Sequence, residues 1–272
     1  MKDRIINVYK KTGETPLDCI NNIKKVDQEL RFVPMTYAGR LDPLAEGVLI
    51  VLTGDMCHKK DEYLSLTKEY ELDVLFGFKT DTYDVMGKIL EEDSSGKLFE
   101  KSSGAVEGSL SQTISNNLSS DFISKIQKVL PEFIGRIKQL YPPYSSRTVK
   151  GKPLFEWARE GKIDEIEIPS HDVYVENIEI IGQTTICGQI LLGDIKEKIS
   201  KVSGDFRQEE IHMDWQNSLQ SKEQIEFLVV KLKIICGSGV YVRSIANELG
   251  KKLGIPALAL KIVRTKVGEY GI

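Results

Sequence analysis

The chain has 272 residues and a mass of 30.6 kDa, enough for one large domain or two. Its 41% hydrophobic and 28% charged residues are typical of a globular protein and exclude a fibrous or wholly disordered chain. The net charge of −3 conceals a segregation, because residues 136–152 carry five cations and no carboxylate, whereas residues 161–225 carry 13 acids and six bases. Residues 231–272 are again basic, with eight Lys or Arg against two acids. These basic zones are compatible with an anionic ligand.

Neither the start of the chain nor its apolar runs indicate export or membrane insertion. The early apolar run at residues 48–52 is far shorter than the ~20 residues that cross a bilayer, so we expect a cytoplasmic protein. No two cysteines form a C-x-x-C pair, and the histidines lack the spacing of a metal site. The sequence therefore predicts no disulfide framework and no metal site, and ordinary surface or core roles for His58, His171 and His212.

The first third of the chain predicts two kinds of strand and one capped helix. A short strand is expected over residues 5–9. A helix should follow, because Thr15 is an N-cap candidate, Pro16 occupies the first helical position and an acid stands three residues after the cap. The continuous apolar run at 48–52 predicts a buried strand, and the alternation over 70–76 predicts a half-buried one. The apolar stripe of the helix consists of Leu17, Ile20, Ile23, Val26 and Leu30.

The remainder of the chain mixes helices and strands without regular alternation. Residues 94–120 contain nine serines in 27 positions, which predicts a flexible insertion over about residues 92–120. The overall pattern favours an α+β fold with a mixed, mainly antiparallel central sheet flanked by helices and loops. The predicted elements are helices over 122–130 and 242–253 and strands over 173–181 and 227–235.

The segment around Asp42 is the most informative part of the sequence. Gly39 and Gly47 bracket an Asp42-Pro43 step, which sets up a tight loop directly before the strand at 48–52. A carboxylate in such a loop would be held rigidly at the edge of a sheet. An isolated Asp-Pro step is, however, more often a plain turn.

The neighbours of Asp42 match a longer signature. Seven positions in register fit the pattern G-x-L-D-P-x-A-x-G-x-L, and the segment resembles the TruB family of pseudouridine synthases on this basis. The matching residues are Gly39, Leu41, Asp42, Pro43, Ala45, Gly47 and Leu49. Further blocks similar to that family are Lys68-Glu69-Tyr70, Thr80-Asp81-Thr82-Tyr83-Asp84, Gly151-Lys152-Pro153-Leu154-Phe155, Gly239-Val240-Tyr241-Val242-Arg243-Ser244 and Val263-Arg264-Thr265.

The resemblance implies a pseudouridine-synthase fold in a single catalytic domain over residues 1–272, with a basic thumb-like segment at about residues 131–161. It implies a cofactor-free isomerisation of uridine to pseudouridine in RNA, at position 55 in the T-loop (T-arm) of tRNA. We expect tRNA as the partner, with no metal and no obligate protein partner. Because the chain ends directly after the predicted closing strand, we also expect no C-terminal RNA-binding domain of the PUA type.

Three residues are expected to carry the reaction. The resemblance assigns the essential aspartate to Asp42, and a carboxylate can attack or stabilise an electron-poor sugar carbon and later leave. The sequence leaves two alternatives open, action at the sugar and action at the base. Arg243 falls in the first turn of a predicted helix, where the macrodipole disfavours a cation, so an anionic partner such as Asp42 is expected nearby. The resemblance places Tyr70 against the extruded uracil, with its hydroxyl assisting proton removal from C5. A core tyrosine and an exposed arginine are the ordinary alternatives.

Seven further residues are expected to bind the RNA. Tyr241 would be a second aromatic beside the flipped base, and Tyr37 stands where the family usually has a histidine and could replace it by stacking. The cations of the thumb-like segment interleave with tyrosines, which fits a loop that grips an RNA backbone, with a solvated loop as the alternative. The full set is Lys10, Tyr37, Lys68, Tyr241, Arg147, Lys150 and Lys152.

Other functions remain open from the sequence. An RNA-binding or RNA-chaperone protein could use the same scaffold with vestigial activity, although binding alone needs no set of Asp42, Tyr70 and Arg243. A pseudouridine synthase for a different RNA is a second alternative. A hydrolytic glycosidase is a remote third, since Glu46 is the one acid close to Asp42 in the sequence.

Overall fold

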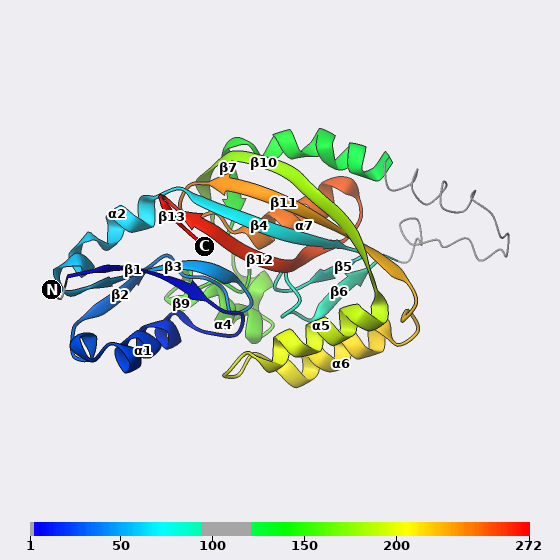
Figure 1. Cartoon of the computed structure of the whole chain (residues 1–272). Helices are drawn as coiled ribbons and strands as arrows, with labels where there is room; N and C mark the ends of the chain where they lie inside the picture. Colours follow the sequence, from blue (N-terminus) through cyan, green and yellow to red (C-terminus); the bar gives the residue numbers. More distant parts are fainter. Residues whose placement is uncertain (1–2, 94–120) are drawn as a thin grey trace.

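A nine-stranded sheet forms the centre of the computed structural model, which describes residues 3–93 and 121–272 (Figure 1). The strand order is β1-β3-β12-β4-β11-β10-β7, with β2 also paired to β3 and β13 to β12. All of these pairs are antiparallel except β3 with β12, so the predicted mixed, mainly antiparallel α+β sheet is confirmed. The strands are β1 (Ile5–Lys10), β2 (Met35–Ala38), β3 (Glu46–Thr53), β4 (Lys68–Phe76), β7 (Gly135–Leu140), β10 (Ser170–Cys187), β11 (Glu226–Cys236), β12 (Ala257–Val267) and β13 (Tyr270–Gly271).

One face of the sheet is covered by α7 (Val242–Leu253) and by a helix over residues 121–129, which continues into the 3-10 turn η3 (Leu130–Phe133). The alternation predicted for β4 is confirmed, because its residues Tyr70, Leu72, Val74 and Phe76 belong to the core cluster on this face. The predicted end of α7 is also confirmed, since Gly254 adopts the left-handed conformation that closes the helix.

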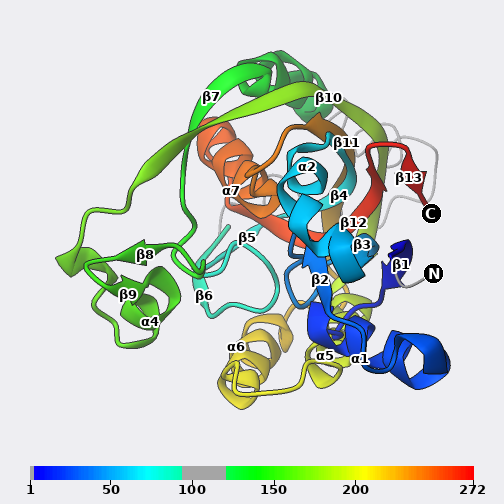
Figure 2. The same cartoon turned by 90° about the vertical axis from the view of Figure 1, so that its left-hand side faces the viewer.

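The opposite face is covered by a helical hairpin that the sequence analysis did not predict. Helices α5 (Gly188–Ser200) and α6 (Gln208–Leu219) lie side by side below the sheet in Figures 1 and 2. They interrupt the chain between β10 and β11, which are hydrogen-bonded neighbours up to the pair Cys187–Glu226. The hairpin buries an apolar stripe made of Leu191, Ile195, Ile199, Ile211, Trp215 and Leu219.

The first helix, α1 (Pro16–Val26), begins with the predicted capping box between Thr15 and Asp18. Its predicted apolar stripe is only partly correct, because Leu17 and Val26 are 60% and 86% exposed. The helix packs on β1–β3 through its central apolar side chains, Cys19, Ile20 and Ile23. Leu30 is buried but belongs to a separate 3-10 turn, η1 (Gln28–Leu30).

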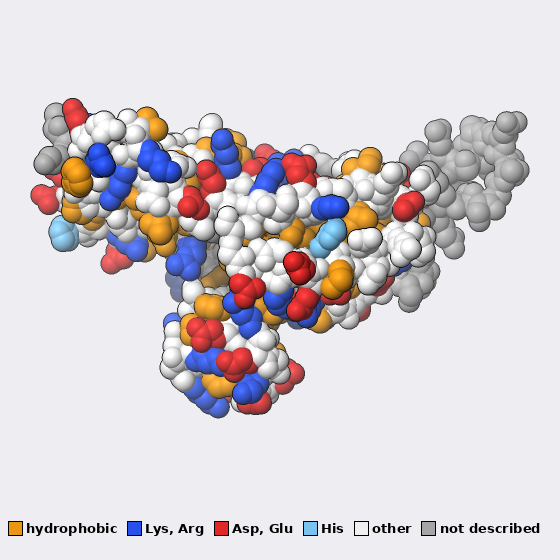
Figure 3. All heavy atoms as spheres, turned by 90° about the horizontal axis from the view of Figure 1, so that it is seen from below, with side chains coloured by type: hydrophobic (Ala, Val, Ile, Leu, Met, Phe, Trp, Pro, Cys, Tyr) orange, Lys and Arg blue, Asp and Glu red, His pale blue; other side chains and the backbone are white. Residues whose placement is uncertain are grey.

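A smaller lobe projects from the sheet between β7 and β10. It contains the short strands β8 (Thr148–Val149) and β9 (Lys152–Pro153) and the helix α4 (Leu154–Arg159), and it lies within the predicted thumb segment, residues 131–161, whose first part instead forms η3 and the sheet strand β7. Figure 2 shows it extending to the left of the sheet, and Figure 3 shows it as a lobe whose surface carries both Lys or Arg and Asp or Glu side chains. It is followed by the 3-10 turn η4 (Ile163–Glu165).

The remaining described elements connect the sheet to these layers. They are η2 (Gly54–Lys59), α2 (Lys60–Ser65), β5 (Phe78–Thr80) and β6 (Ile89–Glu92). The predicted Ser-rich insertion lies, from residue 94 to residue 120, outside the described residues. In the described part of the chain no helix is long and apolar enough to cross a membrane.

Candidate active site

The loop between β2 and β3 presents Asp42 next to the sheet, as predicted. The backbone amide of Ala45 donates to the carbonyl of Asp42 at 3.1 Å, which closes a tight turn with Pro43 at its second position. Gly47 has a φ of 113°, and a Cβ there would lie 2.2 Å from the carbonyl oxygen of Arg264. Only glycine therefore permits the close approach of β3 to β12 that fixes the end of this loop.

Asp42 is held by an ion pair with Arg243, the partner that the sequence predicted. Arg243 Nε lies 2.8 Å from Asp42 Oδ2, and the side chains are 4% and 34% exposed respectively. The other two guanidinium nitrogens donate to the carbonyls of Thr82 and Tyr144 at 2.7 and 2.8 Å. Burial alone would lower the pKa of Arg243, but the nearby charges, Asp42 foremost, outweigh it and raise that pKa. A permanently charged, buried arginine thus orients a carboxylate that remains open to solvent.

Lys10, predicted to bind substrate, instead lies beneath the loop. The residue is fully buried, and its amine donates to the carbonyls of Lys11, Pro43 and Ala45 at 3.2, 3.3 and 2.6 Å. Burial lowers the pKa of Lys10 from 10.5 to about 8. Because all three donors are used inside the protein, this lysine supports the Asp42 loop and offers no donor to an RNA.

Lys68 is a second lysine whose predicted contact with substrate is corrected in the same way. It is 5% exposed, and its amine donates to the carbonyl of Leu64 and, at 2.6 Å, to that of Leu66. Burial lowers the pKa of Lys68 from 10.5 to about 8. Its donors hold the connection between α2 and β4, two residues before Tyr70.

Tyr70 lies opposite Arg264 across the β4–β12 pair and is 9% exposed. Burial raises the pKa of Tyr70, an effect that the charge of Arg264 opposes and the charge of Asp42 reinforces. The hydroxyl therefore keeps its proton at neutral pH. The structure thus agrees with the ordinary alternative, a core tyrosine, and also brings the ring within electrostatic reach of Asp42.

Arg264 is a site residue that the sequence analysis named only as part of a motif block. It is 1% exposed, and its Nε and Nη2 donate to the carbonyls of Val48 and Gly39 at 2.7 and 3.0 Å. These two carbonyls lie on either side of the Asp42 loop. The same strand also carries Lys261 and Lys266, which are exposed, so the sequence pattern alone does not single out Arg264 as the buried cation.

Three aromatic rings form a cluster next to the ion pair. Tyr141 and His171 are stacked with ring centroids 4.1 Å apart, and Tyr241 meets both rings edge-on at 5.9 and 6.1 Å. The Arg243 guanidinium lies 5.8 Å from the Tyr241 ring, which links the cluster to Asp42. Burial raises the pKa of Tyr241. Strand β10 brings His171 to Tyr241, a proximity that no sequence spacing reveals.

Tyr241 is fixed from its backbone side. Its amide donates to Gln139 Oε1 at 2.8 Å, and Gln139 Nε2 donates to its carbonyl at 3.1 Å. Gln139 is buried on β7, at the base of the thumb segment. The start of α7, and with it Arg243, is therefore tied to the thumb segment.

The three predicted cations of the thumb segment differ in their surroundings. Arg147 and Lys150 are exposed, Arg147 lying 5.2 Å from the Tyr141 ring and Lys150 at the turn between β8 and β9. Lys152 instead forms an ion pair with Glu160 and lies 4.5 Å from the Trp157 ring. Arg147 and Lys150 are thus better placed than Lys152 to meet a phosphate backbone.

Tyr37 lies on β2, away from the other predicted site residues. Its hydroxyl accepts a hydrogen bond from Arg40 Nη2 at 3.3 Å, and the Lys60 amine lies 5.7 Å from its ring. No contact in the described structure joins it to Asp42, Tyr70 or Arg243. Arg40, two residues before Asp42, connects Tyr37 to the start of the loop.

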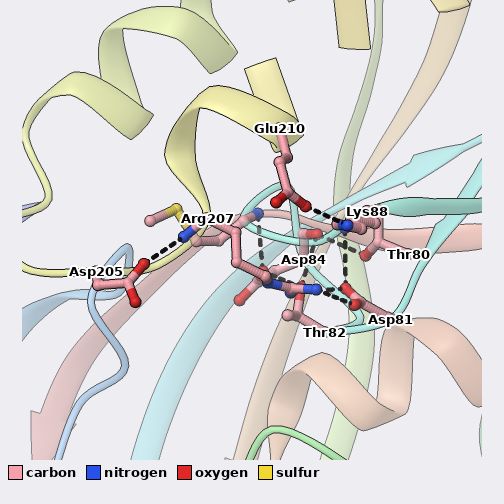
Figure 4. A network of polar contacts seen from close by, with 9 residues as sticks. Thr80, Asp81, Thr82, Asp84, Lys88, Asp205, Arg207 and Glu210 are labelled. Carbon is pink, nitrogen blue, oxygen red and sulfur yellow. Dashed lines mark hydrogen bonds and ion pairs between the residues drawn. The ribbon is translucent and has the colours of Figure 1, made fainter. Parts of the chain in front are cut away.

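The loop after β5 supports Arg243, because its residue Thr82 accepts a hydrogen bond from the guanidinium. Asp84 accepts hydrogen bonds from the Thr82 hydroxyl at 2.7 Å and from the Met86 amide at 2.9 Å. Burial raises the pKa of Asp84 from 3.8 to about 6, while the Arg243 charge acts in the opposite direction. Figure 4 shows Asp84 and Thr82 together with Arg207 and Glu210 from the start of α6. Within residues 3–93 and 121–272 no cluster of His, Cys, Asp and Glu could hold a metal ion.

A solved structure shares this fold. A Cbf5-Nop10-Gar1 complex superposes with a TM-score of 0.53 over 98% of this chain and 49% of that one, at 18% identity. The chain thus shares the fold of a protein in that complex.

Sequence comparison defines the family. The model described as "TruB family pseudouridylate synthase (N terminal domain)" matches residues 28–120 and 100–192. Proteins named tRNA pseudouridine synthase B from Acaryochloris marina and Caldanaerobacter subterraneus are each 30% identical, over 96% and 99% of this chain and 66% and 70% of their own lengths. The Staphylococcus aureus protein of that name is also 30% identical, over 99% of this chain and 68% of its own. The chain therefore belongs to the TruB family and spans about two thirds of these relatives.

Proposed function

We propose that this protein is a tRNA pseudouridine synthase that converts the uridine at position 55 of the T-loop to pseudouridine, with Asp42 as the nucleophile. One observation carries the proposal: the buried Arg243 holds Asp42, and the aspartate side chain is still 34% exposed. A carboxylate fixed in orientation yet open to solvent is what covalent catalysis on a bound nucleotide requires. The names of the relatives, each a tRNA pseudouridine synthase B, support tRNA as the substrate.

The isomerisation exchanges one bond for another within the same nucleotide. The bond between N1 of uracil and C1′ of ribose breaks while the Asp42 carboxylate attacks, and the freed uracil turns over. C5 then forms a bond to C1′, the proton on C5 leaves, N1 gains a proton, and the carboxylate is released. Reactants and product are isomers, so the reaction consumes no second substrate. Tyr70, which stays protonated, is suited to contact the base with its ring and to relay the C5 proton with its hydroxyl.

A uridine in a folded T-loop must leave its stack before Asp42 can reach it. The cluster of Tyr141, His171 and Tyr241 offers aromatic faces that compensate for the lost base stacking. Arg147 and Lys150 provide exposed positive charge for the RNA backbone. Arg147 lies next to the aromatic cluster, because its guanidinium contacts the Tyr141 ring. The cytoplasmic location and the absence of an obligate protein partner expected from the sequence remain predictions.

The test is tritium release from a tRNA transcript that carries [5-³H]uridine, followed by carbodiimide mapping of the product. The wild-type protein should release tritium from the T-loop uridine alone. Asp42→Asn should abolish release and retain tRNA binding, because it removes the nucleophile and preserves size and polarity. Asp55→Asn, an exposed carboxylate on η2, is the matched control and should behave as the wild type.

Three outcomes would contradict the proposal. Absence of release together with intact tRNA binding would favour the RNA-binding or RNA-chaperone alternative, especially if Asp42→Asn still assisted RNA folding. Release only from another RNA would keep the reaction and change the substrate. Appearance of free uracil would identify a hydrolase.

A further inference from the structure

The α5–α6 hairpin does more than cover the sheet, because the loop between its helices reaches the residues that hold Arg243. Arg207, at the start of α6, forms a two-pronged ion pair with Asp81, with N–O distances of 2.7 and 3.3 Å (Figure 4). The two side chains are only 17% and 19% exposed. An ion pair of this geometry, shielded from water, is far more effective at fixing positions than a surface pair.

The same arginine contacts the thumb segment. Its guanidinium lies 4.5 Å from the centre of the Tyr144 ring. Burial, followed by the charge of Asp81, raises the pKa of Tyr144. Arg207 thus joins two segments that are otherwise 60 or more positions apart in the sequence.

Those two segments are the ones that supply carbonyl acceptors to Arg243. Asp81 immediately precedes Thr82, whose carbonyl accepts from Nη1 of Arg243, and the carbonyl of Tyr144 itself accepts from Nη2. Displacement of either carbonyl would turn the guanidinium and, through its Nε, the Asp42 carboxylate. The contacts therefore run continuously from Arg207 through Asp81 and Tyr144 to Arg243 and Asp42.

The backbone of Arg207 indicates that its placement is imposed by the surroundings. Its φ of 62° and ψ of 30° are left-handed values, which a non-glycine residue adopts at a cost in energy. Such conformations persist where neighbouring contacts determine them, and they concentrate at functional sites.

Further contacts keep the hairpin loop in place. Glu210 pairs with Lys88, and Trp215 Nε1 donates to the carbonyl of Val85 at 3.1 Å, so α6 is joined to the loop after β5 at two more points. On the other side, Arg159 of the thumb segment donates to the carbonyl of Asp205. The hairpin thus contacts both segments that hold Arg243.

We infer that the α5–α6 hairpin is a brace for the catalytic ion pair, and that Arg207 is the positioning residue through which it acts. Arg207 does not touch the substrate in this scheme. It fixes Asp81 and Tyr144. The carbonyl of Thr82, next to Asp81, and the carbonyl of Tyr144 then orient Arg243. The activity that it serves is the one put forward under Proposed function, on which this part of the inference rests.

Activity separates this role from RNA binding. Arg207→Ala should lower kcat for tRNA about 10-fold with KM within about twofold, because a misplaced catalytic group slows the reaction without weakening uniform binding. Lys196→Ala, which removes an exposed cation from α5, is the matched control and should leave both constants unchanged. Arg207→Lys should recover only part of the rate, since an amine cannot make the two-pronged contact. Asp81→Asn should resemble Arg207→Ala, and the double variant should be no slower than the slower single variant.

Amide hydrogen exchange tests the brace without any RNA. Arg207→Ala should speed exchange about 10-fold in residues 81–86 and 141–147, whereas Lys196→Ala should not. The inference is overturned if Arg207→Ala matches Lys196→Ala in exchange, or if it raises KM at unchanged kcat. If the wild-type protein released no tritium from tRNA, the proposed function would fail, while the exchange comparison would still decide whether the hairpin holds these segments.

Discussion

The buried and the exposed cations of this molecule have different surroundings and, we expect, different roles. Lys10, Lys68, Arg243 and Arg264 are at most 5% exposed, and each directs its donors to backbone carbonyls or to Asp42. Arg147 and Lys150 of the thumb segment are exposed. Positive charge near this site therefore does not by itself mean contact with RNA, because the buried cations shape the site and the exposed ones remain available to phosphates.

The largest effect is expected at Arg243. Its replacement by Ala leaves Asp42 unoriented and the carbonyls of Thr82 and Tyr144 without this donor, so kcat should fall on the order of 10³-fold while the Kd for tRNA changes less than about threefold. Arg243→Lys should regain at most a small part of the rate, because one amine cannot reach all three acceptors. Single-turnover kinetics and a tRNA-binding assay measure the two quantities. An equal loss in kcat and in affinity for tRNA would place Arg243 among the RNA-binding cations. It would contradict the separation between buried cations that shape the site and exposed cations that meet the RNA.

Lys10 offers a test through stability and pH. Lys10→Met should lower the free energy of unfolding by roughly 2 kcal/mol, because the carbonyls of Pro43 and Ala45 lose their donor. The pKa of Lys10 is lowered from 10.5 when unfolded to about 8 when folded, so between these values the unfolded chain binds the extra proton. The stability of the wild type relative to Lys10→Met should therefore rise as the pH increases from 8 to 10.5.

Urea unfolding at several pH values measures this difference. Lys11→Met, next to Lys10 but exposed, is the matched control and should show neither the loss nor the pH dependence. A flat difference between wild type and Lys10→Met across that range would mean that the Lys10 amine is not confined as the structure describes.

Asp84 extends the comparison to a buried acid. Its folded pKa of about 6 lies above its ordinary value of 3.8, so the folded protein holds the proton more tightly over this range. The stability of the wild type relative to Asp84→Asn should fall, on the order of 1 kcal/mol, as the pH rises from about 4 to about 6. Asn can still accept from the Thr82 hydroxyl and the Met86 amide, which keeps the fold. Thermal unfolding at several pH values measures this difference, with the exposed Asp55→Asn as control. A stability difference between wild type and Asp84→Asn that does not change with pH would contradict the prediction.

The smallest effects are expected in the thumb segment. Arg147→Ala or Lys150→Ala should each raise the Kd for tRNA about threefold and reduce the slope of log K against log salt by about 0.9 or less, with kcat unchanged. Lys152→Ala should change the slope less, because its charge is already paired with Glu160. Equal slopes for all three variants would show that pairing within the protein does not decide which cations meet the RNA.

The sequence revealed the parts of this molecule that have local patterns. The capping box at Thr15, the alternation in β4 and the glycine that ends α7 all follow from neighbouring residues. The pairing of Asp42 with Arg243 was also predictable, since a cation in the first turn of a helix needs an anion.

What was missed depends on burial and on distant contacts. Lys10 and Lys68 have the same side chain as an RNA-binding lysine, and only the tertiary structure shows their amines facing inward. The α5–α6 hairpin had a readable signal in the four-residue spacing of Leu191, Ile195 and Ile199, which the surrounding charges obscured. Its contact through Arg207 joins residues 126 positions apart, which no local pattern encodes.

The position of β12 has a consequence for how the site is made. This strand comes last among the long strands in the sequence, yet it lies between β3 and β4 and carries Arg264, which holds both sides of the Asp42 loop. Without β12, the β4–β11–β10 ladder has no strand pairing with β3 in the described part of the chain. Asp42 and Arg243, 201 positions apart, thus belong to parts of the described sheet that β12 joins by strand pairing. A chain without residues 257–267 would therefore lack the contacts of Arg264 with both sides of the loop that carries Asp42.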